Sequence, residues 1–290
     1  MFDTRIAAFI ELFLAAITWS SFFLIIKVLE ETGLDPVVII SARMILAAIL
    51  IGIVAIAMRL KMPRLKDVPL LMIPGILFFF GSILIGSGEE GESPGVTAFI
   101  GFLIPIIISL FLLEKLKVKL THIGIAALVV AVFGFLLTGL GDDFIFSFDL
   151  LVVFFGACLV GVYFVSQKFL VKKHGPYVVT CFTMWGSAIF GLYSMPEFFG
   201  NLSVMSTNDW LMLSLIAIVS TLIPFFLFTH AMRIVGPAEG TAVNILIPFF
   251  GSLLSFLFSG FPITTLTIIG GVVSLVGVLF YITRGIESTE

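Results

Sequence analysis

The sequence predicts an all-α integral membrane protein with ten transmembrane helices, arranged as two inverted five-helix repeats with both termini in the cytoplasm. Three observations lead to this prediction. The chain of 290 residues is 60% hydrophobic and only 11% charged, with a mean hydropathy of +1.25. Basic and acidic residues alternate between the connections that separate its long apolar segments. One motif also occurs twice along the chain, at a constant offset.

Composition excludes a soluble globular protein, because a surface that faces water carries about 25% charged residues. Each crossing of a bilayer takes about 20 apolar residues, so ten crossings use about 200 and leave only short connections. The sequence has no Cys and His spacing typical of a metal site and no glycine-rich phosphate loop. We therefore predict no catalytic residues, metal, cofactor or nucleic acid partner, and no direct use of ATP.

Ten spans follow one another along the chain, separated by charged, glycine-containing or proline-containing interruptions. The N-terminal segment is similar to a secretory signal, but its apolar stretch continues to about Ile26 without a small-residue cleavage site and contains Glu11. We interpret it as the first span. The predicted spans are 6–27, 36–58, 69–86, 94–113, 121–140, 149–168, 176–195, 210–232, 237–259 and 263–283.

Orientation follows from the short connections, since those rich in Lys and Arg stay in the cytoplasm. With the N-terminus inside, 13 of the 15 basic residues fall in inner segments, and the other two, Lys27 and Arg43, lie within spans. The outer connections carry acidic residues instead. This alternation predicts a multi-pass protein of the cell (inner) membrane with both termini inside.

An internal repeat divides the chain into halves at about 1–145 and 146–290. The segment from Pro94, PGVTAFIGFLIPIIIS, matches the segment from Pro237, PAEGTAVNILIPFFGS, in both prolines and in the final serine. These segments are the fourth and ninth predicted spans. Because each half has five spans, an odd number, the second half is inverted in the membrane. Inverted repeats place a substrate site near the midplane, between the halves.

Several segments resemble the ten-helix EamA-type transporters of the drug/metabolite transporter superfamily. They are AAITWSSFF at 15–23, Ala-Arg-Met at 42–44, Pro105 followed by Leu-Glu-Lys-Leu at 113–116, and HAMRIVGPAEGTAVNILIP at 230–248. The resemblance implies two inverted five-helix repeats, alternating access, and in many members export of amino acids or related metabolites. The essential membrane glutamate of the four-helix multidrug relatives would align with Trp19, so its role is not carried over to Glu11.

Glu11 and Arg43 lie well inside predicted spans, where charge is costly and usually functional or paired. Glu11 lies about 8 Å into the first span, at about 1.5 Å per residue. It is our candidate for proton coupling, and the alternative is a structural pair near the cytoplasmic interface. Arg43 could hold a substrate carboxylate. Its structural alternative is a contact with backbone carbonyls or with an acid such as Asp35.

Polar and aromatic residues near the middle of the spans are candidates for the substrate site. Trp19 shares one helix side with Glu11 and needs a partner for its indole N–H. Tyr163 and Gln167 are four residues apart on the sixth span, and Asn244 replaces Gly101 of the first repeat. Plain helix packing or interhelical hydrogen bonding explains these residues equally well.

Three further residues are candidates for moving parts. His230, beside Arg233 at the cytoplasmic end of the eighth span, could be a pH-sensitive gate or a substrate contact, with an ordinary interfacial role as the alternative. Pro105 and Pro248 interrupt the backbone hydrogen bonds of equivalent spans and could act as hinges or line a cavity. Two packed kinks are the alternative.

We therefore predict a transporter that moves a small-molecule substrate through a central cavity between the repeats, embedded in the lipid bilayer, with a monomer as the working assumption. One alternative is a proton-coupled multidrug exporter for lipophilic cations. Another is a non-transporting membrane scaffold or sensor. An enzyme is not predicted, because no cluster of His, Asp or Ser falls at membrane depth.

Overall fold

The computed structural model describes residues 4–30, 33–89, 94–115, 120–139, 148–200, 205–260 and 262–284. Within these residues every secondary-structure element is a helix. The longer helices are α1 Arg5–Glu30, α2 Pro36–Ala57, α3 Val68–Glu89, α4 Pro94–Lys115, α5 His122–Gly139, α6 Phe148–His174, α7 Pro176–Gly191, α9 Thr207–Ala217, α10 Ile223–Ala231, α11 Pro237–Val243, α12 Ile247–Ser259 and α13 Thr265–Arg284. A short helix, α8 Met195–Gly200, lies between α7 and α9.

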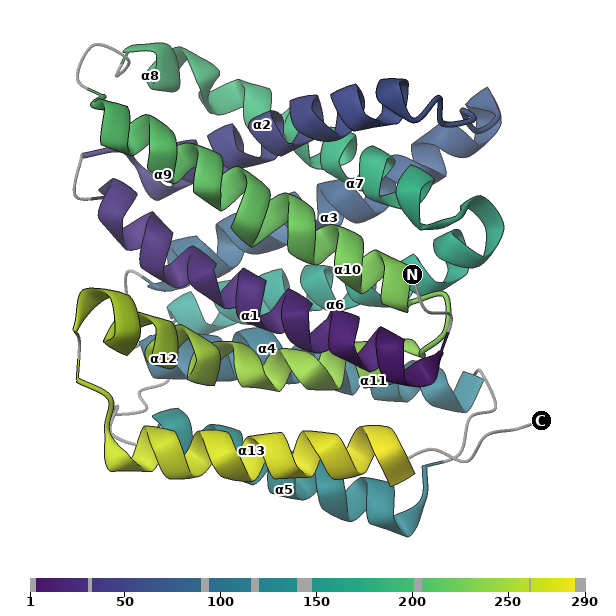
Figure 1. Ribbon diagram of the computed structural model, residues 1–290, viewed down its shortest axis with the longest axis vertical. Coiled ribbons are helices and arrows are strands. Elements are labelled where there is room, and N and C mark those ends of the chain that lie inside the picture. Colours follow the sequence, from purple (N-terminus) through teal and green to yellow (C-terminus); the bar gives the residue numbers. More distant parts are fainter. Residues whose placement is uncertain are drawn as a thin grey trace.

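The helices lie side by side in one bundle, with α2 and α7 toward one edge and α5 and α13 at the other (Figure 1). α1 begins and α13 ends at the same end of the bundle, on the right in Figure 1. A contact between the Arg5 side chain and the Ile282 carbonyl joins these two termini. We call this end the basic end, since the described connections there carry Arg59, Lys61, Arg64, Lys66, Lys172, Lys173 and Arg233.

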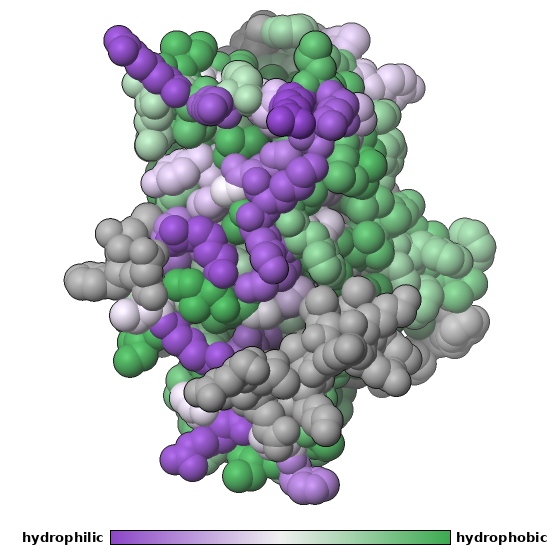
Figure 2. Space-filling model, turned by 90° about the vertical axis from the view of Figure 1, so that its right-hand side faces the viewer, coloured by the Kyte–Doolittle hydropathy of each residue, from purple (hydrophilic) through white to green (hydrophobic). Residues whose placement is uncertain are grey.

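Hydrophilic side chains gather on the basic end, and hydrophobic side chains cover the flanks next to it (Figure 2). Large apolar side chains on the flanks are exposed, as in Ile56, Phe258 and Phe280. A helix surface of this kind is stable in lipid but not in water. The distribution therefore fits a protein whose helices cross a bilayer from the basic end to the opposite end.

Eight helical segments of the described chain are long and apolar enough to cross a membrane. Two further apolar segments are shorter, Ile100–Leu110 and His122–Thr138. They fall in the fourth and fifth predicted spans. The chain is thus a multi-pass membrane protein, whereas the count of ten spans and their orientation stay predictions.

The two halves pack against each other through equivalent pairs of helices. α1 of the first half packs against α10 and α12 of the second, and α6 of the second half packs against α3 and α4 of the first. α2 packs against its counterpart α7, and α5 packs against its counterpart α13. Matching contacts of this kind are what two repeats related by a two-fold axis predict.

Close approach of α5 and α13 depends on glycine. A Cβ atom on Gly134 would lie 2.4 Å from the backbone nitrogen of Ser274, and one on Gly277 would lie 2.4 Å from that of Ala131. The Ser274 hydroxyl donates to the Ala131 carbonyl at 3.0 Å. Small residues allow such contact between membrane helices.

Two spans that the sequence predicts as continuous are interrupted in the structure. A π-helical turn, Ile218–Leu222, separates α9 from α10, and a 3-10 turn, Asn244–Leu246, separates α11 from α12. Each turn is followed by a proline, Pro224 or Pro248, which has no N–H to donate to the preceding turn. Other differences are at helix ends. α6 extends past the predicted boundary to His174, and α8 occupies part of a predicted connection.

Candidate functional site

Six aromatic side chains meet in the middle of the bundle, and we call them the aromatic cluster. They come from α1 and α3 of the first half and from α6 and α10 of the second. The Trp19 ring lies 5.5 Å from that of Phe225 and 5.9 Å from that of Phe164, measured between centroids. The members are Trp19, Phe78, Tyr163, Phe164, Phe225 and Phe228.

Two polar groups of the aromatic cluster and its immediate surroundings have hydrogen-bonding capacity left over. Within the described residues, the Tyr163 hydroxyl and the Gln167 amide nitrogen are buried without a hydrogen-bond partner. The Gln167 carbonyl oxygen accepts from the Thr229 hydroxyl at 3.2 Å. Leaving a buried donor unsatisfied costs about 1–3 kcal/mol, so a ligand or a water molecule that accepts these bonds would be held here.

Asn244 lies in the 3-10 turn that follows α11, and its side-chain nitrogen is also buried, with no hydrogen-bond partner in the described part of the chain. One turn earlier, a Cβ on Gly240 would lie 3.1 Å from the Phe228 ring. This places α11 against the aromatic cluster, although no contact between Asn244 itself and a cluster ring is found in the described residues. The same turn also contacts α4, α5 and α13.

The basic end of the bundle is closed by two contacts between α1 and the helices of the second half. The Glu11 carboxylate lies 2.7 Å from His230 Nδ1, and both side chains are buried. Closer to the end, the Arg5 guanidinium pairs with Glu239. Glu239 is held in place by the Gly236 N–H, which donates to its second oxygen at 2.7 Å. Glu11 and His230, predicted for different roles, therefore form one pair, away from the aromatic cluster.

Lysine and arginine side chains support this closure from the second half. Lys168 Nζ donates to the Val235 carbonyl at 2.8 Å. A guanidinium nitrogen of Arg233 contacts His230 Nε2. The loop between α10 and α11 is thus tied both to α6 and to the histidine that holds Glu11.

Arg43 lies on α2, apart from the basic end, and is 5% exposed. Its Cζ lies 4.1 Å from the centroid of the Phe22 ring. Asp35, the acid considered as its partner, instead caps α2 by accepting from the Val37 N–H at 2.7 Å. Neither Asp35 nor a backbone carbonyl bonds to Arg43 in the described residues.

The two candidate hinge prolines have different surroundings. Pro105 lies inside α4, which is continuous, whereas Pro248 is at the start of α12 after the 3-10 turn. In that turn the Ile247 N–H donates to the Asn244 carbonyl. The next residue, Pro248, has no N–H and cannot donate. The hinge role of both residues stays a prediction.

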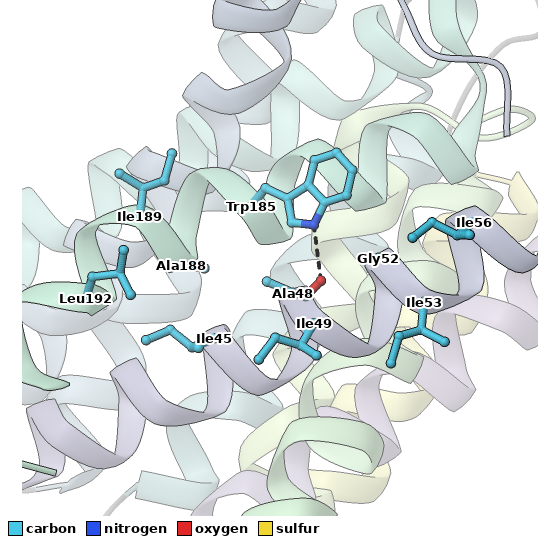
Figure 3. Close-up of a pocket in the computed structure, with 10 residues that line it drawn as sticks. All are labelled: Ile45, Ala48, Ile49, Gly52, Ile53, Ile56, Trp185, Ala188, Ile189 and Leu192. Atoms are coloured by element: carbon cyan, nitrogen blue, oxygen red, sulfur yellow. Dashed lines mark hydrogen bonds between the residues drawn. The ribbon is translucent and has the colours of Figure 1, made fainter. Parts of the chain in front are cut away.

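A separate groove lies on the outer surface, between α2 and α7 (Figure 3). It holds about 490 Å³, and the Trp185 indole N–H donates across it to the Ala48 carbonyl at 3.1 Å. Its other lining side chains are apolar, and several, such as Ile53 and Ile189, are exposed on the lipid-facing flank. It has no free polar group to orient a polar solute, so we do not assign the substrate to it.

No three His, Cys, Asp or Glu side chains come close enough to hold a metal ion in the part of the chain that is described. The two cysteines are free thiols, Cys181 buried and Cys158 half-buried.

Comparison with known proteins assigns the family. The profile of the EamA-like transporter family matches the chain twice, over residues 6–140 and 147–283. The chain belongs to the EamA-like transporter family. The family is part of the drug/metabolite transporter superfamily, so the chain is a membrane transporter with a small-molecule substrate and a lipid environment, a class of protein that is generally not enzymatic.

Relatives and solved structures agree with this assignment. The chain is 30% identical over 268 residues, 90% of its length and 86% of the other's, to "Uncharacterized transporter YdfC" of Bacillus subtilis. It is 25% identical over 274 residues, 92% and 91% of the two lengths, to a "Probable terminal-alkyne amino-acid exporter" of Streptantibioticus cattleyicolor. A crystal structure with 20% identity has a TM-score of 0.75 and covers 96% of each chain. At that identity it shows the fold alone.

Sequence patterns alone did not identify most residues of the EamA-like transporter's aromatic cluster. They also did not identify the contacts that close its basic end. Phe78, Phe164, Phe225 and Phe228 are four of 33 phenylalanines, and a phenylalanine that faces lipid has the same local pattern as one that faces the centre. Glu239 could have been found more easily. It is an acidic residue at the start of a predicted span, on the side of the membrane where the connections are basic. That position favours a pair with a basic residue from another helix.

Proposed function

We propose that this EamA-like transporter exports amino acids or related small metabolites across the cell (inner) membrane by alternating access. The aromatic cluster is the wall of the substrate chamber, and Trp19, Tyr163 and Gln167 contact the substrate. The single observation that carries this proposal is the cluster itself. It is built from both halves of the chain and lies beside buried donors that the protein leaves unpartnered.

A chamber of this composition suits a solute with an apolar body and few polar groups. Ligand sites are mostly apolar, with a small number of polar groups that fix orientation. The rings of Trp19, Phe225 and Tyr163 supply the apolar wall, while the Tyr163 hydroxyl and the Gln167 amide supply the polar contacts. Asn244, from the interrupted ninth span, is the proposed polar contact from the other side of the chamber.

Alternating access requires the two ends of the chamber to open in turn. The Glu11–His230 and Arg5–Glu239 contacts join α1 to α10 and α11, so they must separate before the basic end can open. We propose that they form the cytoplasmic gate, in a protein of ten spans whose inverted halves move against each other. Pro105 and Pro248 are the proposed hinges.

Export and the amino-acid substrate class are taken from the relative in Streptantibioticus cattleyicolor, whose name describes an amino-acid exporter. A multidrug exporter for lipophilic cations would need an acidic side chain open to the chamber. Glu11 is bonded to His230 instead, which supports the metabolite proposal over that alternative. A scaffold or sensor predicts no flux for any solute.

Counterflow in proteoliposomes tests the proposal. Vesicles are loaded with one unlabelled amino acid at a time, and the uptake of its labelled form is followed. We expect protein-dependent uptake, reduced about tenfold or more by Trp19→Ala, since a buried aromatic contact of the substrate is lost. The matched control is Trp185→Ala, which changes the outer groove of Figure 3 and should leave counterflow within about twofold of the unsubstituted protein.

Three outcomes would contradict the proposal. Equal loss of counterflow in the Trp19 and Trp185 variants, both folded and monodisperse, would mean that the aromatic cluster has no special role. Absence of flux for a panel of amino acids, sugars and cationic drugs would favour the scaffold or sensor. Flux of cationic drugs alone, abolished by Glu11→Gln, would favour the multidrug exporter.

A further inference from the structure

Arg43 is a buried cation for which the described residues supply no counter-charge. It is the eighth residue of α2, about 10 Å along the helix from its first residue at about 1.5 Å per residue. Its Nε is buried and has no hydrogen-bond partner among the described residues. No carboxylate lies within ion-pair distance of it in the described chain, and Asp35 is engaged at the helix cap. A buried charge is normally paired, because an isolated one is very costly.

Arg43 makes one aromatic contact among the described residues. Its Cζ lies over the Phe22 ring, 4.1 Å from the ring centroid, which is a cation–π contact. The donors of a guanidinium lie in its plane, and the described residues offer no hydrogen-bond partner to Nε. The planar fork matches a carboxylate, which can accept two parallel hydrogen bonds from it.

Phe22 connects Arg43 to the substrate chamber. It follows Trp19 by three residues on α1, so the two side chains lie on the same side of the helix, one turn apart. Phe22 also packs against two separate groups of buried apolar side chains. One group lies in the centre of the bundle and the other lies between α2 and α9. Beside it, the Ser21 hydroxyl is 2.6 Å from that of Ser220 in the π-helical turn, where the regular hydrogen bonding of the eighth span is interrupted. π-helical turns are frequent at functional sites.

We propose that Arg43, held on the Phe22 ring, binds the carboxylate of the substrate while the aromatic cluster receives its apolar part. This inference rests on the proposed function, and it defines the substrate class as a carboxylate attached to an apolar body. An inorganic anion such as chloride would pair with the guanidinium but leave the adjacent aromatic wall unused. A solute without a carboxylate would leave the buried guanidinium unpaired.

The test compares acid and amide forms of one compound. L-leucine and L-leucinamide, and L-phenylalanine and L-phenylalaninamide, compete for counterflow and are also assayed by thermal shift of the purified protein. In the unsubstituted protein we expect each acid to compete about tenfold or more better than its amide, as a lost charge-assisted pair predicts. In Arg43→Gln we expect this preference to disappear, with competition by the amide unchanged. Arg43→Lys, which keeps the charge but not the fork, should be intermediate.

Ser41→Ala is the control, because Ser41 is a buried polar residue of the same helix that lies against Gly191 of α7. It should keep the full preference for the acid. Three results would overturn the inference: preference for the acid retained in Arg43→Gln, equal loss of acid and amide competition in that variant, or equal stabilisation by sodium chloride and by the acid. The thermal shift separates this inference from the proposed function. Stabilisation by the acid that depends on Arg43, in a protein without flux, would uphold the carboxylate site and reject transport.

Discussion

His230 lies between a carboxylate and a guanidinium. Its Nδ1 is 2.7 Å from the Glu11 carboxylate. The Arg233 guanidinium contacts Nε2 and also lies 3.3 Å from Nδ1. The Glu11–His230 contact is therefore supported from the loop that follows α10.

At this scale we predict the effect of Glu11→Gln. We propose that Glu11 carries the coupling proton. Glutamine can still hydrogen-bond to His230 Nδ1 but cannot take up a proton, so the contact is kept while this coupling is removed. We expect accumulation driven by an imposed pH gradient to fall until the substrate concentrations inside and outside are equal. Counterflow without a gradient should persist. Both are measured in the same proteoliposomes with the labelled amino acid.

Asp67→Asn is the control for this prediction. Asp67 is another carboxylate of the basic end, paired with Lys173 at 2.7 Å, but the lysine is largely exposed. Exposed ion pairs contribute about 0–1 kcal/mol, so both transport assays should be unchanged. Full gradient-driven accumulation by Glu11→Gln would show that this carboxylate carries no coupling proton.

Among the helices, those of the second half are less regular than their counterparts in the first. Pro224 follows a π-helical turn and Pro248 follows a 3-10 turn, whereas α4 continues through Pro105. Where proline removes a donor, the preceding turn can widen or tighten to satisfy its carbonyls. The two interrupted spans contain Ser220 and Asn244, respectively, whereas Tyr163 and Gln167 lie on α6, which is continuous.

The most regular pair, α5 and α13, should be sensitive to small changes in side-chain volume. We predict that Gly134→Ala lowers the free energy of unfolding by about 1–3 kcal/mol, because the new methyl would overlap the α13 backbone at 2.4 Å. Thermal unfolding in detergent measures the change. Gly200→Ala, where an added Cβ meets no atom within 4 Å, should be neutral or slightly stabilising. Equal effects of the two substitutions would contradict close packing of α5 on α13.

For the whole molecule, the distribution of charge between its two ends predicts which end faces the cytoplasm. We expect single cysteines at Lys61 and His122 to resist an impermeant maleimide added to intact cells, and one at Glu197 to react. All three positions are exposed, and the background lacks Cys158 and Cys181. Permeabilised cells should show labelling at all three.

Position 122 tests the two shorter apolar helices in particular. If the chain crosses the membrane at α4 and again at α5, His122→Cys lies on the inner side with Lys61→Cys. If neither helix crosses, it lies on the outer side and reacts in intact cells. Labelling of Lys61→Cys from outside, with protection at Glu197, would reverse the orientation.

The sequence by itself determined the membrane class, most of the helix positions, and the location of basic residues at one end. These properties depend on local hydropathy and on charge counts, which need no knowledge of contacts. It also drew attention to Glu11, Arg43, Trp19 and His230, because polar groups are rare and costly within spans. Their roles were left open, since a single charged residue in a span is compatible with either function or packing.

Only the tertiary structure decided which residues meet. Glu11 and His230 are 219 positions apart and pair across the two halves. Four phenylalanines join Trp19 and Tyr163 in one cluster, and the Cζ of Arg43 lies over the Phe22 ring, whereas Asp35 caps α2. Helix periodicity gives each side chain a direction on its own helix, but the partner depends on the rotation and spacing of neighbouring helices. Those are set by side-chain packing over the whole bundle, which no local pattern encodes.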